Sequence, residues 1–511
     1  MRKALFAILG MAAMFVACSQ TVSASSNDDE EKASATDSSD SKGSGDGSSG
    51  SGSSEDALDK DCVGEPGKPW DGTTAKEFAC GSGTKLSPYI ILTAEQLAKL
   101  AFIVGANEKE YEGKYYKLAA DIKLNDGKVI DDKGALVADS SKLHKWTPIG
   151  NSSVAFTGNF DGNGHTVSGM FINTTSSHNG LFGNSSGTVQ NVTVADSWVT
   201  GGKFTGGVVG NISGTANIVG AVNQATIVGL GDGVGGVIGN YTFVCCNKIG
   251  TVKNVKNYGI VSAIKYVGGV IGSARYIEIS EAENYTDVSG THRTGGIAGN
   301  LENNSKLSDS KNYGNILGDE LVGGIIGYYG YCCSKGAAGD IANIKNTGRV
   351  EGKEYVGGVV GKNENSSNKN IMNSGVVNGK NYVGGLFGYI NNSSTINVYN
   401  TANVSGTISV GGVIGYNKEG VTNAAYSTGK VDGDSLVGLM IGYNYNTTMA
   451  DYYYLKQGDQ EPFGQNNGGG VATPKTATEM KSADFAKLLG DDFVYDSGLN
   501  DGYPVLAWEK E

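Results

Sequence analysis

The sequence VGGVIG, at residues 267–272, recurs in variant form along most of the chain. Successive copies, aligned on their last glycine, lie 27, 29, 33, 27, 28, 34, 27, 27 and 27 residues apart. A period of this length is typical of stacked units that cannot bury their apolar faces alone. The ground period is therefore 27 residues, and its glycines are Gly183, Gly210, Gly239, Gly272, Gly299, Gly327, Gly361, Gly388, Gly415 and Gly442.

Other positions keep the same register. Fifteen residues before the last glycine stand Asn257, Asn284, Asn312, Asn346, Asn373 and Asn400, with Ser427 in the final copy. Four residues further on, the chain carries Val261, Val288, Ile316, Val350, Val377, Val404 and Val431, a position that must face a core. Glycine recurs between these positions, so each coil is predicted to contain three short strands separated by glycine or asparagine corners.

Three repeat architectures compete for this pattern. A propeller blade needs about 40 to 50 residues, and a leucine-rich repeat needs an LxxLxL strand and usually a helical return. We therefore predict an all-β fold, a right-handed parallel β-helix of about ten 27-residue coils. Its strands would stack about 4.8 Å apart, and the corner asparagines would form a side-chain amide ladder.

The copies GGVVG, GGVIG, GGIIG and GGLFG resemble the GLUG-motif repeat family of bacterial surface proteins. The segment FTGNFDGNGHTVSGMFI, at residues 156–172, looks like the opening coil of such proteins. Two copies depart from the pattern, because Asn179 and Leu439 each replace a glycine, as is expected of terminal coils. The resemblance runs from about residue 89 to the C-terminus, and it implies a surface-attached or adhesin-like protein without a catalytic set.

The N-terminus is predicted to be a lipoprotein signal peptide, residues 1–18. Arg2 and Lys3 precede an apolar run that is too short to span a bilayer. The run ends in FVAC, which resembles a lipobox and implies cleavage before Cys18 and diacylation of its thiol; Ser19 then suggests the outer membrane. The alternative is an ordinary signal peptide with an incidental cysteine.

Residues 19–61 are predicted to form a disordered linker. They are rich in Ser and Gly and carry eleven acidic residues against three lysines. This segment accounts for most of the formal net charge of −12. The remainder has no basic stripe, so a nucleic-acid partner is not expected.

A cap is predicted at each end of a β-helix that occupies residues 146–455. In the N-terminal cap, residues 62–145, Cys62 and Cys80 can form a disulfide. Thr93 and Gln96 begin an amphipathic helix there, with Leu97, Leu100, Ala101 and Val104 on one face. Residues 456–511 contain a second helix-like segment and form the C-terminal cap.

Two coils are longer than the ground period, after Gly239 and after Gly327. Each insertion contains a vicinal cysteine pair, Cys245-Cys246 and Cys332-Cys333. Insertions in a solenoid become loops on one face, and these four cysteines are disulfide candidates. A four-thiolate metal site is the alternative, although exported proteins rarely keep thiols reduced.

The search for catalytic motifs finds little. The sequence has no HExxH, no GxSxG and no phosphate loop, so we expect no cofactor and no metal. Asp161 and His165, in FDGNGHT, are the best catalytic-looking pair, but Asp-Gly-Asn-Gly is first of all a turn signal.

An aromatic pattern follows the repeat. The residue after the last glycine is Tyr328, Lys362, Tyr389, Tyr416 and Tyr443 in five successive coils. Tyr355 and Tyr382, six residues before their glycines, are exposed candidates too. The tyrosines form either a structural ladder on the solenoid surface or a platform on which sugar rings lie.

Two functions follow from these observations. The first is a non-catalytic surface lipoprotein that adheres to, or scaffolds, a polysaccharide or another cell-surface polymer, with no enzymatic activity. It would be anchored at the bacterial outer membrane or cell surface. The second is a secreted β-helix enzyme, a polysaccharide lyase or glycosidase, which would need a groove with at least two converging carboxylates.

Overall fold

The structure is a computed structural model that describes residues 62–137, 139–242, 249–331 and 338–510. Cys18, Cys245, Cys246, Cys332 and Cys333 lie outside the described residues. The predicted lipidation of Cys18 and the pairing of the other four cysteines therefore stay predictions.

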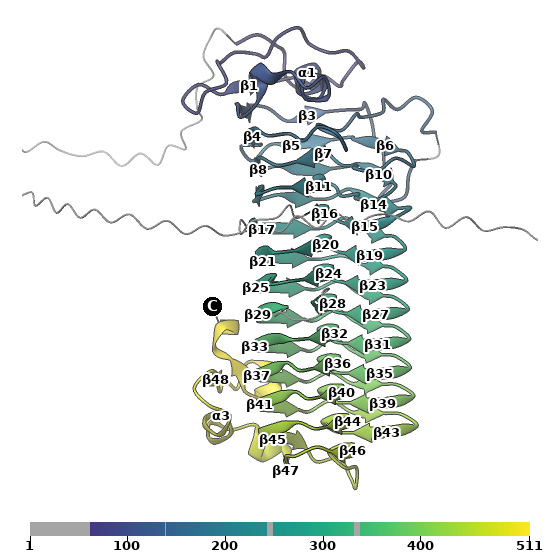
Figure 1. Cartoon of the computed structure of the whole chain (residues 1–511), viewed down its shortest axis with the longest axis vertical. Coiled ribbons are helices and arrows are strands. Elements are labelled where there is room, and N and C mark those ends of the chain that lie inside the picture. Colours follow the sequence, from purple (N-terminus) through teal and green to yellow (C-terminus); the bar gives the residue numbers. More distant parts are fainter. Residues whose placement is uncertain (1–61, 138, 243–248, 332–337, 511) are drawn as a thin grey trace, which may run out of the picture. The chain divides into compact units, whose positions relative to one another are not determined.

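The described residues form an all-β parallel solenoid of about 13 turns with few helices, as predicted (Figure 1). The turns exceed the ten predicted coils because both predicted caps contribute strands. The first rung is β1 (Tyr89–Ile91), which pairs with β2 (Tyr115–Leu118). The last rung contains β46 (Phe463–Asn467) and β47 (Ala472–Lys475).

Each regular coil contains four strands rather than the predicted three. One coil consists of β21 (Ile277–Asn284), β22 (Val288–Ser289), β23 (His292–Gly295) and β24 (Ala298–Glu302). The glycine pair of the repeat is a corner between the last two strands, not part of one strand. A Cβ on Gly296 would lie 2.3 Å from the carbonyl oxygen of Gly324 in the next coil, so this corner requires glycine.

Equivalent strands of successive coils pair in parallel and build four sheets, here named A to D in coil order. Sheet A contains β1, β2, β3 (Ile122–Lys123), β4 (Asn159–Asp161), β5 (Thr166–Ser168), β8 (Thr188–Gln190), β9 (Thr193–Ala195), β12 (Asn217–Val219), β13 (Val222–Asn223), β17 (Gly250–Asn257), β21, β25 (Lys306–Asn312), β29 (Gly339–Asn346), β33 (Ser366–Asn373), β37 (Ser394–Asn400), β41 (Val421–Ser427), β45 (Thr448–Leu455) and β47. Sheet B contains β6 (Phe171–Asn173), β10 (Trp198–Gly201), β14 (Thr226–Gly229), β18 (Val261–Ser262), β22, β26 (Ile316–Leu317), β30 (Val350–Glu351), β34 (Val377–Asn378), β38 (Val404–Ser405) and β42 (Val431–Asp432).

The other two sheets meet at the glycine corner. Sheet C contains β15 (Asp232–Gly235), β19 (Lys265–Gly268), β23, β27 (Glu320–Gly323), β31 (Glu354–Gly357), β35 (Asn381–Gly384), β39 (Ile408–Gly411) and β43 (Ser435–Gly438). Sheet D contains β7 (Phe182–Ser185), β11 (Val209–Ser213), β16 (Ile238–Thr242), β20 (Ile271–Arg275), β24, β28 (Ile326–Gly330), β32 (Val360–Glu364), β36 (Phe387–Asn391), β40 (Ile414–Lys418), β44 (Ile441–Tyr445) and β46.

The core repeats with the sequence. The Val and Ile four residues after each ladder asparagine are buried, as predicted. The asparagines form the predicted amide ladder, because from Asn223 to Asn373 each Nδ2 donates to the asparagine Oδ1 of the next coil at 2.8–2.9 Å. Each Nδ2 also donates to a main-chain carbonyl two residues along its own chain. The ladder amides therefore supply hydrogen-bond partners for the buried main-chain carbonyls of the asparagine corner.

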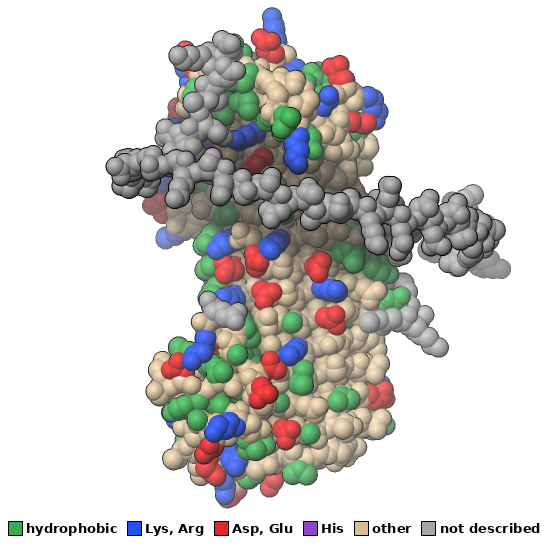
Figure 2. Space-filling view, turned by 90° about the vertical axis from the view of Figure 1, so that its left-hand side faces the viewer, with side chains coloured by type: hydrophobic (Ala, Val, Ile, Leu, Met, Phe, Trp, Pro, Cys, Tyr) green, Lys and Arg blue, Asp and Glu red, His purple; other side chains and the backbone are tan. Residues whose placement is uncertain are grey.

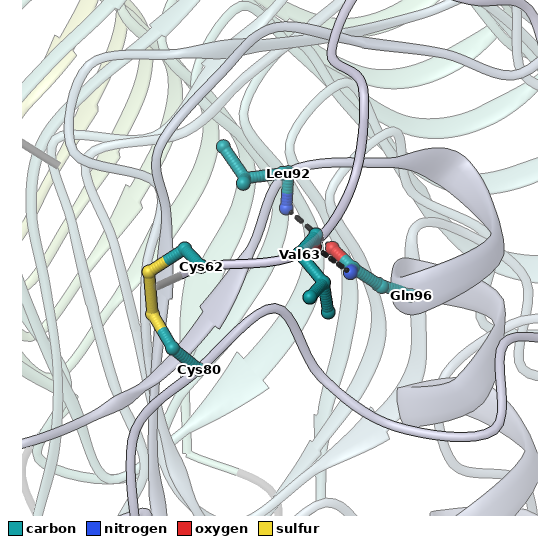
Figure 3. The surroundings of a disulfide bond; sticks show 5 residues. All are labelled: Cys62, Val63, Cys80, Leu92 and Gln96. Atoms are coloured by element: carbon teal, nitrogen blue, oxygen red, sulfur yellow. Dashed lines mark hydrogen bonds between the residues drawn. A yellow bond between two sulfur atoms is a disulfide. The ribbon is translucent and has the colours of Figure 1, made fainter. Parts of the chain in front are cut away.

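The N-terminal cap closes one end of this core. Helix α1 (Ala94–Gly105) begins with the predicted capping box of Thr93 and Gln96. Leu97 and Leu100, on the helix face predicted to be apolar, are buried. The Cys62–Cys80 disulfide is present (Figure 3). The side chain of Gln96 accepts a hydrogen bond from the main chain of Leu92 and donates one to that of Val63. A disulfide that closes a loop of this length contributes about 3 kcal/mol. A short 3₁₀ turn, η1 (Lys109–Tyr111), follows the helix.

The C-terminal segment does not cap the other end but folds back beside sheet A (Figure 1). It contains α2 (Ala477–Met480), α3 (Ala483–Leu489), η2 (Asn500–Gly502), η3 (Ala507–Lys510) and the antiparallel pair β48 (Phe493–Val494) and β49 (Val505–Leu506). We call residues 476–510 the strap. At the open end, the side chains of Gln457 and Gln460 donate to main-chain carbonyls that no further strand covers.

The strap lies where the outer face of sheet A turns apolar. One outward position reads Lys256, Glu283, Lys311, Lys345, Met372, Tyr399, Tyr426 and Tyr453 in successive coils. The strap packs Phe485, Leu489, Phe493 and Leu506 against the last four of these residues. Its last 3₁₀ turn places Glu509 against Lys345, at 3.2 Å. The strap therefore ends at the point where this position becomes charged.

Candidate functional site

Tyr389, Tyr416 and Tyr443, here called the tyrosine row, stand side by side in sheet D. They pair in register on β36, β40 and β44, as the repeat predicts. All three side chains are partly exposed. Their ring centroids lie 5.2 and 4.8 Å apart, with interplanar angles of 17° and 22°.

The ring faces of the row are turned mainly toward one another. Nearly parallel rings at these distances cannot lie edge to edge in one plane; they overlap in an offset stack, with about 3.5–4 Å between neighbouring carbon atoms. The central ring, Tyr416, therefore has both faces partly covered. Burial and the nearby Glu364 carboxylate raise the pKa of Tyr389 to about 12. The row offers ring edges and hydroxyls rather than a flat aromatic platform.

Tyr355 and Tyr382 support the row from sheet C. Their rings stack at 4.9 Å and meet Tyr389 and Tyr416 edge to face, at 5.8 and 5.9 Å. Both residues have a left-handed backbone, with φ of 53° and 54°. These contacts hold the rings of the row in a ladder, which leaves ring edges and hydroxyls, rather than ring faces, for a ligand.

Tyr328 does not belong to the exposed surface. Its side chain is only 8% exposed, with the Arg293 guanidinium 4.2 Å from the ring centroid. Its hydroxyl donates to Glu364, and Lys362 lies between its ring and that of Tyr389. The predicted binding residue is therefore the buried end of an ion network that interrupts the stack.

Asp161 and His165 are not brought together. The Asp161 carboxylate accepts hydrogen bonds from the main chain of Asn163 and from the side-chain amides of Asn191 and Gln190. His165 instead faces Asp121, at 3.3 Å. Three donors on one carboxylate are typical of a structural turn, as the Asp-Gly-Asn-Gly sequence predicts.

A cleft of about 590 Å³, here called the cap cleft, lies beside Asp161. Its floor is the outer face of β2, β4 and β8, and residues Lys85, Leu86 and Pro88 form one wall. Sequence reasoning missed this cleft, because the wall belongs to a Gly/Ser turn that precedes the repeats. The signal that could have found it is a lone leucine in an otherwise polar turn, GSGTKLSP.

A second tyrosine stack borders sheet A and was also missed. Tyr258, Tyr285 and Tyr313 follow the ladder asparagines directly, and their centroids lie 4.6 and 4.9 Å apart. Beside them, a groove of about 250 Å³ is bounded by the strap residue Trp508 and lined by Asn254, Lys256, Glu281, Glu283, Asp309, Lys311 and Asn343. Acidic and basic side chains lie intermingled on this side of the solenoid (Figure 2).

The carboxylates of this groove are already paired. Burial acts to raise the pKa of Glu283, but hydrogen bonds from Lys256 and Tyr285 outweigh it and hold the pKa below its usual value. Glu281 lies 3.3 Å from Lys253, and Asp309 accepts a hydrogen bond from Asn343. At neutral pH, Glu283 is therefore ionised and poorly suited to donate a proton to a leaving group.

Metal-ligand residues do not cluster in the described ranges. Among residues 62–137, 139–242, 249–331 and 338–510, no group of three or more His, Cys, Asp or Glu is placed to hold a metal ion. In the same ranges, no helix is both long and apolar enough to cross a membrane.

Comparison with known proteins gives partial matches. No family model matches the chain. Halomucin of Haloquadratum walsbyi is 32% identical over 231 residues, which cover 40% of this chain and 2% of halomucin. A protein of Evansella cellulosilytica named "Putative Gly-rich membrane protein" is 34% identical over 149 residues, or 27% of this chain and 15% of that protein. The chain thus matches only a small part of each relative.

A solved structure shows a remote likeness. The crystal structure of a "putative immunoglobulin A1 protease" from Bacteroides ovatus has a TM-score of 0.32 and 17% sequence identity. The match covers 84% of this chain and 95% of that one. At this TM-score the likeness supports no conclusion about activity.

Proposed function

We propose that this chain is a non-catalytic, lipid-anchored surface protein that adheres to or scaffolds a polysaccharide or another cell-surface polymer. The observation that supports this best is the tyrosine row, which repeats one hydroxyl group along the solenoid at the spacing of its strands. A ligand that itself repeats can bind several such groups at once, and weak contacts then sum by multivalency. A small molecule gains nothing from this repetition.

The proposed location draws on the sequence and on the relatives. The N-terminal FVAC resembles a lipobox, and the repeats resemble those of the GLUG-motif surface proteins. One of the two partial relatives carries the name of a membrane protein and the other that of a halomucin. We propose the bacterial outer membrane or cell surface as the site of action.

The anchor is tested by a single substitution. We expect Cys18→Ser to release the protein into the soluble fraction, because the thiol that would carry the lipid is lost. The wild-type chain, expressed in the same bacterium, should stay with the membrane fraction. Unchanged membrane fractionation of Cys18→Ser would refute the lipid anchor.

The tyrosine row is tested by removing its hydroxyls while keeping its rings. We expect the triple variant Tyr389→Phe, Tyr416→Phe and Tyr443→Phe to lose retention on insoluble polysaccharide, with the melting temperature shifted by no more than about 4 °C, because the stack is preserved. A pull-down on cellulose, chitin, xylan and starch measures retention.

The matched control replaces the other stack. Phenylalanine at Tyr258, Tyr285 and Tyr313 removes three hydroxyls from the stack beside sheet A and should leave retention unchanged. If the two triple variants bind equally well, the row is structural only, and the adhesive surface lies elsewhere.

An enzymatic alternative has one observation in its favour. The groove beside Trp508 gathers Glu281, Glu283 and Asp309, and glycosidases act through pairs of carboxylates. Each of these carboxylates has a lysine or amide partner. A raised pKa, which a general acid requires, is the opposite of what Lys256 produces at Glu283. We therefore prefer the non-catalytic function.

A further inference from the structure

We propose that the cap cleft binds a sugar ring of the polymer, with Leu86 as an apolar clamp. This inference rests on the proposed function and adds a site that the repeats alone do not supply. The ligand chemistry is that of a pyranose, which has an apolar C–H face and a rim of hydroxyls. Neutral and acidic sugars share this chemistry.

The floor of the cleft provides the polar half of the site. Three successive rungs hold Tyr115, Asn159 and Thr188 in one row, and Lys117, Asp161 and Gln190 in a second. Both rows point outward, because Tyr116, Phe160 and Val189 between them are buried. The rungs repeat about every 4.8 Å, and the rows lie about 7 Å apart. Hydroxyl, amide and carboxylate groups therefore cover an area of about the width of a sugar ring.

Part of the floor is fixed before any ligand arrives. The Nε2 of Gln190 donates to Asp161 at 2.9 Å, and the Nδ2 of Asn191 donates to the same carboxylate at 3.1 Å. The Oε1 of Gln190 accepts no hydrogen bond from the described residues, so this acceptor is oriented and available. Preorganised groups of this kind bind with little loss of side-chain entropy.

The wall of the cleft is equally rigid. The turn at residues 82–87 is closed by hydrogen bonds between Ser82 and Ser87 and between Thr84 and Ser87. The main chain of Tyr115, on the floor, donates to the carbonyl oxygen of Gly83, which ties the turn to β2. The Cys62–Cys80 disulfide and the pairing of Cys80 with Ile90 hold the base of the turn.

Leu86 is the feature that calls for a ligand. Its side chain is 99% exposed on this pinned turn, at the mouth of the cleft. A single exposed leucine is common on protein surfaces, but here it faces an ordered polar floor across a cleft of about 590 Å³, within the usual size range of ligand sites. A ring that hydrogen-bonds the floor and packs its C–H face on Leu86 satisfies both sides.

The test uses the full chain and two matched variants. Leu86→Ser removes the clamp without touching the fold, and Leu317→Ser removes another exposed leucine, on sheet B far along the sequence. Retention is measured on cellulose, chitin and xylan, and on polygalacturonate for acidic sugars. We expect Leu86→Ser to weaken binding about tenfold, as fits the burial of part of a leucine side chain, and Leu317→Ser to bind as the wild type does.

A second readout does not depend on a polymer. Soluble oligosaccharides of the same four kinds are titrated into methyl-labelled protein, and the Leu86 methyl signals, identified by their loss in Leu86→Ser, should shift. A shift without retention on any polymer supports the cleft and contradicts polymer adhesion. Retention that is equal in wild type and Leu86→Ser, with no methyl shift, overturns the cleft and leaves the proposed function standing. If there is no retention on any polymer and no methyl shift, both the cleft proposal and the proposed function are overturned.

Discussion

Replacing Asn346 by alanine is expected to lower the free energy of unfolding by about 2 to 4 kcal/mol. The side chain of Asn346 donates to Gly348 and Asn373 and accepts from Asn312, each at 2.8 Å, in a position with no solvent access. Alanine removes three buried hydrogen bonds, each of which contributes about 0.5–1.5 kcal/mol net, and leaves the Gly348 carbonyl without the side-chain amide that donates to it. Denaturant unfolding followed by circular dichroism measures the change.

A matched control distinguishes loss of the buried ladder from loss of an exposed asparagine side chain. Asn315 lies on the exterior and bonds to Asp287, so Asn315→Ala should cost about 1 kcal/mol or less. If Asn346→Ala and Asn315→Ala lose equal stability, the amide ladder does not support the fold, and this description of the corner is wrong.

Deleting one whole coil is expected to leave a folded protein. Removal of residues 362–388 joins Gly361 to Tyr389, which occupies the same register position as Lys362 in sheet D. The neighbouring coils present the same ladders, so stacking continues. Stability should fall modestly, because the deletion also removes Met372 and the Lys369 contact to Asp492 beneath the strap. Thermal unfolding should remain a single transition.

Deleting half of the same coil is expected to destroy the fold around it. Removal of residues 362–374 takes away β33 and its ladder asparagine, Asn373, while leaving the following strands of that coil. The remaining strands cannot keep both their pairing and their inward positions, since a shift by one residue turns every side chain to the other face. Loss of a cooperative transition and rapid proteolysis should follow. Equal damage from both deletions would contradict independent stacked coils.

The sequence predicted those features that repeat. The period defines the coil, the recurring asparagine defines the amide ladder, and the recurring Val or Ile defines the core. The capping box of Thr93 and Gln96 and the Cys62–Cys80 disulfide could also be predicted, because both depend on local spacing. These features follow from rules that act within one coil or between neighbours.

Features that depend on distant or unrepeated contacts could not be predicted. The spacing did not show that the glycine pair divides one expected strand into two, since the reason for Gly296 is the carbonyl of Gly324 in the next coil. The change from Lys345 to Met372 and Tyr399 along one outward position is the signal from which the strap could be suspected. Ring orientation in the tyrosine row is a property of side-chain packing, and sequence spacing carries no information on it.

One measurement tests the central claim, which is binding to a polysaccharide without turnover. The full chain is incubated with cellulose, chitin, xylan, starch and polygalacturonate. The fraction of protein retained and the new reducing ends are then measured in the same samples. We expect retention on at least one polymer, with no more reducing ends than the heat-denatured chain releases. Reducing ends that increase with protein concentration, or a protein retained by none of the polymers, would contradict this claim.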